Sequence, residues 1–91
     1  MSYHVEFTVS ALQELKKLDR QTSALILGWI RKNLEGCGNP RSYGKALAGN
    51  LSGRWRYRIG DYRLIADIDD EKILILVLCV GHRRDIYERF L

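Results

Sequence analysis

The sequence predicts an α+β fold with the element order β-α-α-β-β-β, in which a helical hairpin covers one face of an antiparallel meander sheet. Two segments between residues 10 and 36 place apolar residues at the 3.6-residue spacing of amphipathic helices. Three segments after residue 53 have the two-residue alternation or the continuous apolar run of β-strands. The 91 residues, of which 46% are hydrophobic, suffice for one core, so we expect a single domain over residues 1–91.

The chain is expected to begin with a strand and a helix. Residues 3–7 alternate weakly, which places Tyr3, Val5 and Phe7 on one face of a strand. Ser10 followed by Gln13 resembles a capping box, which would open a helix at this point. The apolar residues of that helix form one stripe, which consists of Ala11, Leu12, Leu15 and Leu18.

A second helix follows after a short turn, and either Asp19 or Thr22 can cap it. Its apolar stripe consists of Leu25, Ile26, Trp29, Ile30 and Leu34. Gly36 is expected to end the helix, and the following Gly38-Asn39-Pro40 prevents its continuation. The two helices together form an antiparallel helical hairpin.

The second half of the chain predicts three consecutive strands, over residues 54–59, 62–67 and 72–80. Before them, residues 41–53 form a loop with a short strand or turn near residues 45–47. Gly60-Asp61 makes a two-residue hairpin turn between the first two strands. The third strand is apolar on both faces and ends at Gly81, so it or its neighbour is central in the sheet. A short helix over residues 84–91 closes the chain, and the sheet face opposite the helical hairpin stays partly open.

Arginines alternate with apolar residues along the strand predicted over residues 54–59. Successive side chains of a strand point to opposite faces, so Arg54, Arg56 and Arg58 form a row on one face. The other face carries Trp55, Tyr57 and Ile59. A row of guanidinium groups repels itself, but it binds phosphates well through paired N–H donors. This pattern therefore points to RNA or DNA as the ligand.

The distribution of charge supports a phosphate-binding site. The net charge is +4, and residues 41–63 alone contain six Lys/Arg and one acidic residue. We expect a cytoplasmic protein, because the sequence shows no signal peptide and no apolar run that could span a membrane. Cys37 and Cys79 are predicted to be reduced thiols. The two cysteines and two histidines are widely spaced, so neither a metal nor another cofactor is expected.

A second group of polar residues follows the central strand, in the segment from Gly81 to Tyr87. His82 can exchange a proton near neutral pH, and Tyr87 offers a phenol and an aromatic face for a base. These groups suit cleavage of RNA by its own 2′-OH, where arginines neutralise the phosphate. Arginine is a poor base because its pKa is too high, so His82 and Tyr87 are the candidates for proton transfer.

Four motifs give the chain a resemblance to a known family. They are Lys45 to Gly49, Trp55 to Ile59, Gly60 to Arg63 and Gly81 to Tyr87. With the helical hairpin, these motifs resemble the RelE/ParE superfamily of bacterial type II toxins, within its RelE branch. The resemblance covers nearly the whole chain and implies the same compact sheet with a helical hairpin on one face.

The resemblance implies an mRNA interferase, a metal-independent endoribonuclease that cuts mRNA in the A site of the 70S ribosome. Its catalytic positions match Arg56, Arg58, Arg63, Arg83 and Tyr87, and we add His82 as our own inference. Lys45, Arg54 and Arg84 are expected to contact RNA. Well-studied members of the family have lysines at the positions of Arg56 and Arg58. In this chain, Tyr87, His82 or the ribosome should therefore contribute more as the general base.

The resemblance also implies partners and leaves alternatives open. A RelB-like antitoxin is expected to wrap the toxin, and the complex is expected to bind operator DNA through the antitoxin. One alternative is a ParE-like protein that inhibits DNA gyrase by binding. The other is a module that binds RNA or DNA without catalysis. The set Arg63, Arg83 and Tyr87 favours the nuclease over the gyrase inhibitor.

Overall fold

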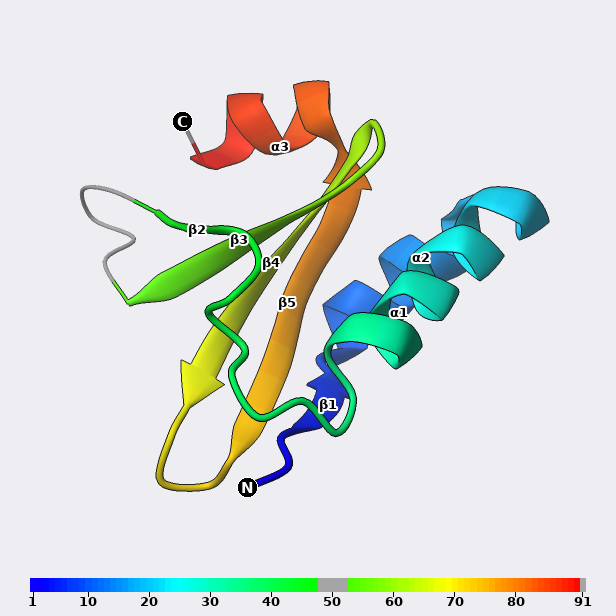
Figure 1. The fold of residues 1–91 in the computed structure, drawn as a ribbon. Helices are drawn as coiled ribbons and strands as arrows, with labels where there is room; N and C mark the ends of the chain where they lie inside the picture. Colours follow the sequence, from blue (N-terminus) through cyan, green and yellow to red (C-terminus); the bar gives the residue numbers. More distant parts are fainter. Residues whose placement is uncertain (48–52, 91) are drawn as a thin grey trace.

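The computed structural model describes residues 1–47 and 53–90, which form a five-stranded mixed sheet and three helices. The strands are β1 (His4–Phe7), β2 (Lys45–Ala46), β3 (Arg54–Ile59), β4 (Tyr62–Asp69) and β5 (Leu74–His82). They lie in the order β1-β5-β4-β3-β2, with β1 parallel to β5 and all other pairs antiparallel (Figure 1). The predicted α+β class and the meander of β3, β4 and β5 are confirmed. Ala48, Gly49 and Leu91, which belong to predicted elements, lie outside the described residues.

The first helix, α1 (Val9–Lys17), begins earlier than predicted. Thr8 rather than Ser10 is its N-cap: the Thr8 hydroxyl oxygen accepts a hydrogen bond from the Ala11 N–H at 3.1 Å. The same hydroxyl donates to the carbonyl oxygen of Leu78 at 3.2 Å, which ties the helix start to β5. The capping box at Ser10 is therefore wrong, because the chain turns into the helix directly after β1.

The second helix, α2 (Arg20–Asn33), is capped by Asp19, whose carboxylate accepts from the Thr22 N–H at 3.1 Å. Ile26, Ile30 and Leu34 are buried as predicted, and Trp29 is half-buried. Leu25 is 59% exposed, and Leu12 of α1 is also exposed, so both predicted stripes were too wide. The sheet covers only the central part of each apolar stripe.

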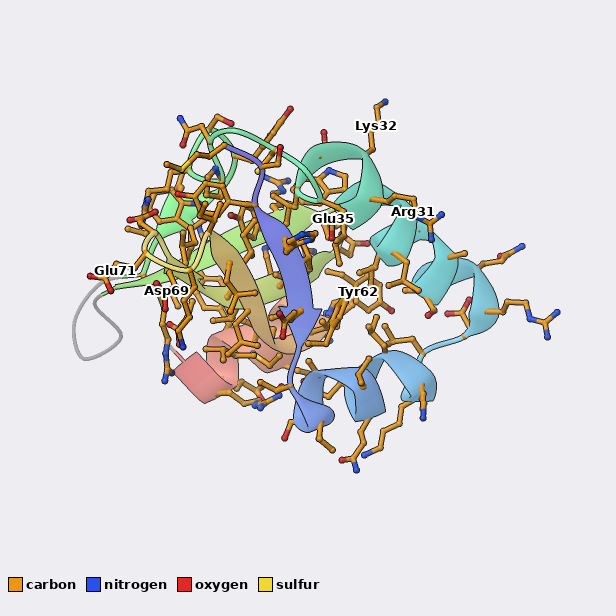
Figure 2. All side chains as sticks on the ribbon, turned by 90° about the horizontal axis from the view of Figure 1, so that it is seen from below. Arg31, Lys32, Glu35, Tyr62, Asp69 and Glu71 are labelled. Atoms are coloured by element: carbon orange, nitrogen blue, oxygen red, sulfur yellow. The ribbon has the colours of Figure 1, made fainter. Side chains whose placement is uncertain are left out.

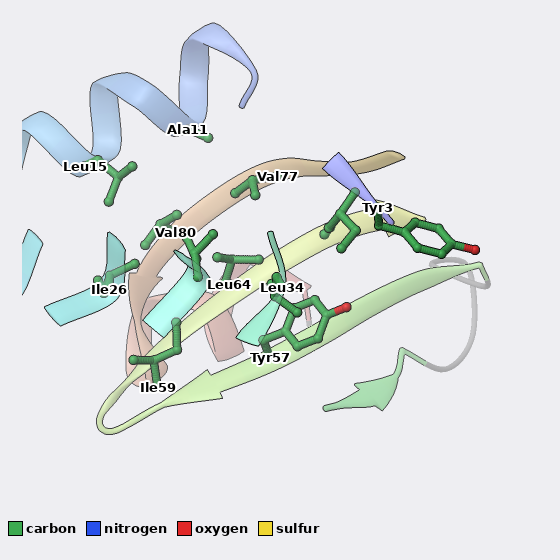
Figure 3. Packing of buried hydrophobic residues seen from close by; sticks show 13 residues of the cluster. Tyr3, Ala11, Leu15, Ile26, Leu34, Tyr57, Ile59, Leu64, Val77 and Val80 are labelled. Carbon is green, nitrogen blue, oxygen red and sulfur yellow. The ribbon is translucent and has the colours of Figure 1, made fainter. Parts of the chain in front are cut away.

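The main core fills the space between the helical hairpin and the sheet (Figure 3). Tyr57 from β3 and Leu64 from β4 are fully buried in it, together with Val77 of β5. The Tyr57 hydroxyl donates to the carbonyl oxygen of Pro40 at 2.5 Å, which fastens the loop after α2 to the sheet. This core fixes which way the side chains of β3 point, and so turns its arginines to the other face.

The last helix, α3 (Arg83–Phe90), covers part of the opposite face, which the sequence predicted as partly open. Its buried Ile86 packs with Leu47, Ile65 and Cys79 in a second, smaller core. Figure 1 shows α3 beside the end of β5 and the β3–β4 hairpin, away from α1 and α2. The open part of this face is thereby confined to the region beside α3.

A β-bulge in β5 changes which residues face the two cores. Ile65 pairs with Cys79 and the next residue, Ala66, pairs with Val77, so Leu78 has no partner across the strand. The strand also continues to His82 instead of ending at Gly81. After the bulge, Val80 points into the main core together with Val77, while Cys79 points into the second core.

Candidate phosphate-binding site

The site begins with the register of the β3–β4 hairpin. The two-residue turn at Gly60-Asp61 pairs Ile59 with Tyr62, and Arg58 therefore lies directly across from Arg63. Arg56 lies on the same face of β3 as Arg58, and Lys45 of β2 is paired with Arg56. The predicted row and its extension by Arg63 are thus confirmed as an arrangement.

Arg63 also lies across from Gly81 of β5, where the close packing of α3 leaves little space. A Cβ atom on Gly81 would lie 3.3 Å from the Ile86 side chain. The first residue of α3 is Arg83, whose N–H donates to the carbonyl oxygen of Asp61 at 2.7 Å. These contacts bring the start of α3 to the hairpin turn, beside Arg63.

The positive charges of this face influence one another. Burial lowers the pKa of the Arg63 guanidinium, and the charges of Arg58, Arg56 and Arg83 lower it further. In the described part of the chain, no carboxylate lies within ion-pair distance of these four arginines. We call Arg56, Arg58, Arg63 and Arg83 the arginine cluster. A bound anion would relieve the repulsion within this cluster.

Arg63 is oriented by the hairpin itself. Its Nη1 donates to the carbonyl oxygens of Gly60 and Tyr62, each at 2.9 Å. A guanidinium carries five N–H donors in a fixed plane, so those on Nη2 and Nε stay available for an anion. The hairpin therefore holds this side chain in place before any ligand arrives, which lowers the entropy lost on binding.

A hollow of about 230 Å³ adjoins the cluster and is lined by Gly44, Lys45, Arg56 and Arg58. Gly44 has a φ of +76°, and a Cβ there would overlap the carbonyl oxygen of Arg56. Glycine at this position lets the loop before β2 lie directly on β3. The hollow is large enough for a phosphate with part of its sugar and is lined by three cationic side chains.

His82 does not join the arginine cluster. It pairs with Tyr62 at the end of the sheet, and the two rings meet edge to face with centroids 5.6 Å apart. Together with Glu14 and Val80 they line a separate cleft of about 290 Å³. The cleft lies on the α1 side of the sheet, so this arrangement argues against His82 as a proton carrier beside the arginines.

The remaining predicted site residues occupy the edges of the face. The Arg54 side chain lies 3.7 Å from a carboxylate oxygen of Asp67, so part of its charge is balanced. Arg84 is exposed on the first turn of α3, and its N–H donates to Nδ1 of His82 at 3.2 Å. Tyr87 is 58% exposed on α3, one residue after the buried Ile86. Its phenol is accessible to a ligand.

Two ion pairs outside the arginine cluster were not predicted. Arg41, which belongs to the basic stretch, forms a bidentate pair with Asp70 at 3.0 and 3.1 Å. Arg89 of α3 donates to Glu14 of α1 at 2.7 Å. The partners are 29 and 75 residues apart, and no local pattern in the sequence marks such pairs.

Comparison with known proteins shows the family to which the chain belongs. Residues 5–87 match the family described as the ParE toxin of type II toxin–antitoxin systems, parDE. The chain belongs to this toxin family. The toxin is 38% identical to toxin RelG of Mycobacterium tuberculosis, over 98% of this chain and 100% of that protein. It is 31% identical to toxin RelE of the same organism, over 93% of this chain and 86% of the relative.

Solved structures give the same result for the fold of the toxin. It is similar to a chain of the toxin–antitoxin complex RelBE2 from Mycobacterium tuberculosis, with a TM-score of 0.83 and 35% identity. That match covers 91% of this chain and 100% of the other. The isolated RelE toxin of Escherichia coli matches with a TM-score of 0.69, covering 99% and 100% of the two chains, and at 21% identity it shows the fold alone. Within the described residues of the toxin, no helix is both long and apolar enough to cross a bilayer.

Proposed function

We propose that the toxin is a ribosome-dependent endoribonuclease that cuts mRNA in the ribosomal A site. The observation that carries this proposal is the arginine cluster, in which four cationic side chains converge with no carboxylate within ion-pair distance among the described residues. A site of this kind suits a transition state with extra negative charge on phosphate. The four residues also match the catalytic positions implied by the resemblance to RelE.

The chemistry that this site supports uses a nucleophile already present in the RNA. The 2′-oxygen attacks the adjacent phosphorus and forms the 2′-O–P bond, while the bond from phosphorus to the 5′-oxygen breaks. The 2′-OH proton leaves to a base, and the departing 5′-oxygen receives a proton. The products are a 2′,3′-cyclic phosphate and a 5′-hydroxyl, and no metal is required. Arg56, Arg58, Arg63 and Arg83 would stabilise the pentavalent phosphate.

Proton transfer is assigned to Tyr87 or to ribosomal groups. Arginine side chains stay protonated near neutral pH because their pKa is high, so they cannot act as the base. Tyr87 has an exposed phenol on the helix that begins beside Arg63, whereas His82 lies on the other side of the sheet. Lys45, Arg54 and Arg84 would hold the neighbouring phosphates of the mRNA.

The partner that this proposal implies is a RelB-like antitoxin. Support comes from the RelBE2 complex of Mycobacterium tuberculosis, whose toxin–antitoxin assembly includes a chain similar to this one. An acidic or amphipathic segment would cover the arginine cluster, because its charge is complementary. The complex would bind operator DNA through the antitoxin, and both proteins would act in the cytoplasm.

Primer extension on a defined mRNA, with and without programmed 70S ribosomes, tests the proposal. We expect codon-phased cuts only when ribosomes are present. Arg63→Ala should lower the cleavage rate by about 10²-fold or more, and Tyr87→Phe by roughly 10²- to 10⁴-fold. Lys32→Ala removes an equal charge from the exposed surface of α2 and should leave the rate unchanged (Figure 2).

Inhibition of DNA gyrase by binding is the second candidate, and it is favoured by the description of the matching family as ParE toxins. A supercoiling assay with purified toxin separates the two functions. Loss of supercoiling, together with intact mRNA in the presence of ribosomes, would establish the gyrase function and reject the nuclease. Salt-sensitive RNA or DNA binding with neither activity would leave a module without catalysis.

A further inference from the structure

Glu14, in the middle of α1, joins three elements through its carboxylate. Its Oε1 accepts a hydrogen bond from the Val80 N–H of β5 at 3.0 Å. Its Oε2 accepts from Nη1 of Arg89, on α3, at 2.7 Å. The Glu14 side chain is 25% exposed, so these bonds are partly shielded from water. One acidic group thus links the helical hairpin to the helix on the opposite side of the sheet.

The position of Glu14 follows from the short length of β1. That strand pairs with β5 only as far as Phe7 and Val77, and Thr8 then turns the chain into α1. Beyond this point the outer edge of β5 is not covered by β1, and its Val80 N–H needs another acceptor. Glu14 supplies that acceptor, and its second oxygen reaches past the sheet edge to Arg89.

The helix α3 is held at three points along its length. The Arg83 N–H is bonded to Asp61 at its start, Ile86 is buried at its middle and Arg89 is bonded to Glu14 near its end. A helix of 8 residues is unstable by itself, so its orientation depends on these contacts. The hydrogen bond with Glu14 raises the pKa of Arg89, which agrees with a strong interaction.

We propose that Glu14 is a positioning residue for RNA cleavage, because through Arg89 it fixes the orientation of α3 and hence of Tyr87 relative to the arginine cluster. This proposal rests on the proposed nuclease function. Glu14 itself lies on the far side of the sheet edge from the cluster and is not expected to touch RNA. Its effect should therefore appear in the rate of the bound complex and not in the affinity for ribosomes.

Glu14→Gln and Arg89→Gln are the test variants. Glutamine keeps the size of Glu14 and an oxygen acceptor for Val80, but it loses the charge that holds Arg89. The cleavage rate at saturating ribosomes should fall on the order of 10- to 100-fold. The ribosome concentration that gives half the maximal rate should stay within about twofold, because Arg56, Arg58 and Arg63 lie on β3 and β4 and are not moved by these changes. Arg89→Lys should restore part of the rate, and Glu6→Gln, which removes an exposed carboxylate from β1, should behave as wild type.

A double-variant cycle separates positioning from a general effect on the fold. If Glu14 acts through Tyr87, then Glu14→Gln should cause little further loss in a Tyr87→Phe background. Losses that simply multiply would overturn the proposal, as would an unchanged rate in both single variants. Circular dichroism and a thermal melt confirm that each variant is folded before its rate is measured.

Hydrogen exchange distinguishes failure of this inference from failure of the nuclease proposal. In both single variants the amides of residues 84–89 should exchange faster, while those of β3 and β4 keep their wild-type rates. Unchanged exchange in α3 would overturn the role of Glu14 whether or not the toxin cuts RNA. If α3 loosens but wild-type toxin cuts no mRNA with ribosomes present, the nuclease proposal fails, and the positioning role fails with it.

Discussion

Substitution of Gly44 by alanine tests whether the loop before β2 must lie directly on β3. At a φ of +76°, an alanine costs about 1–2 kcal/mol in backbone strain alone. The new Cβ would also overlap the carbonyl oxygen of Arg56 and lie 2.8 Å from Nε1 of Trp55. That indole N–H donates to the carbonyl oxygen of Tyr43 at 2.6 Å, and losing this bond costs about 0.5–1.5 kcal/mol. The backbone at Arg56 must also shift to relieve the overlap, which adds to the cost. We therefore expect the free energy of unfolding to fall by about 3 kcal/mol in total.

Gly36→Ala provides a matched control for this prediction. Its φ of +79° is nearly the same, but among the described residues no atom beyond its chain neighbours lies within 4 Å of a Cβ at that position. It should therefore cost only the strain of about 1–2 kcal/mol. Urea unfolding followed by tryptophan fluorescence measures both variants. With a slope of about 2 kcal/mol/M, the midpoint of Gly44→Ala should lie about 0.5–1 M below that of Gly36→Ala.

Equal midpoints for the two alanine variants would refute the reasoning, because the steric overlap at Gly44 would then have no measurable cost. The same substitution should also narrow the hollow lined by Lys45, Arg56 and Arg58. We therefore expect Gly44→Ala to cleave mRNA more slowly than Gly36→Ala when both are folded. This comparison links the shape of the hollow to the proposed reaction.

Three further predictions concern single buried or paired groups. Tyr57→Phe should lower the free energy of unfolding by about 1–3 kcal/mol in urea titrations, because the carbonyl oxygen of Pro40 loses its donor, and an unchanged midpoint would contradict this. The Arg41 guanidinium lowers the pKa of Asp70 below its ordinary value of 3.8, so this pair stabilises the fold above that pH and the stabilisation is lost as the pH falls through the lowered pKa. Asp70→Asn should reduce the acid dependence of the urea midpoint, and a dependence identical to wild type would reject this role. Burial raises the pKa of the Cys79 thiol to about 11, so at pH 8 an alkylating reagent should modify it only as fast as the protein unfolds, which mass spectrometry can follow over time.

Local patterns in the sequence were sufficient to predict the hairpin that carries the arginines. Gly60-Asp61 specifies a two-residue turn, and the turn together with strict alternation sets Arg58 across from Arg63. Asp19 was one of two predicted caps for α2 because a cap depends on residues only three positions apart. Where neighbouring residues determined the structure, the sequence was therefore a reliable guide.

Features set by contacts distant in the sequence were missed. Thr8 became the cap of α1 because its hydroxyl also bonds to Leu78, a residue 70 positions away. The bulge at Leu78 moved His82 to the α1 side of the sheet, and a continuous apolar run gives no sign of such a bulge. The packing of Ile86 against Leu47, Ile65 and Cys79 also depends on residues that are distant in the sequence.

The pairing of Arg58 with Arg63 has a consequence for the stability of the toxin. Like charges directly across two strands destabilise a sheet, so the hairpin is under electrostatic stress whenever it is empty. Any anion that binds there removes this stress and, by mass action, raises the melting temperature. Substrate, inhibitor and antitoxin would thus each raise the melting temperature of the toxin. Measuring this temperature with short oligonucleotides or acidic peptides can therefore detect ligands of this surface without any knowledge of the reaction.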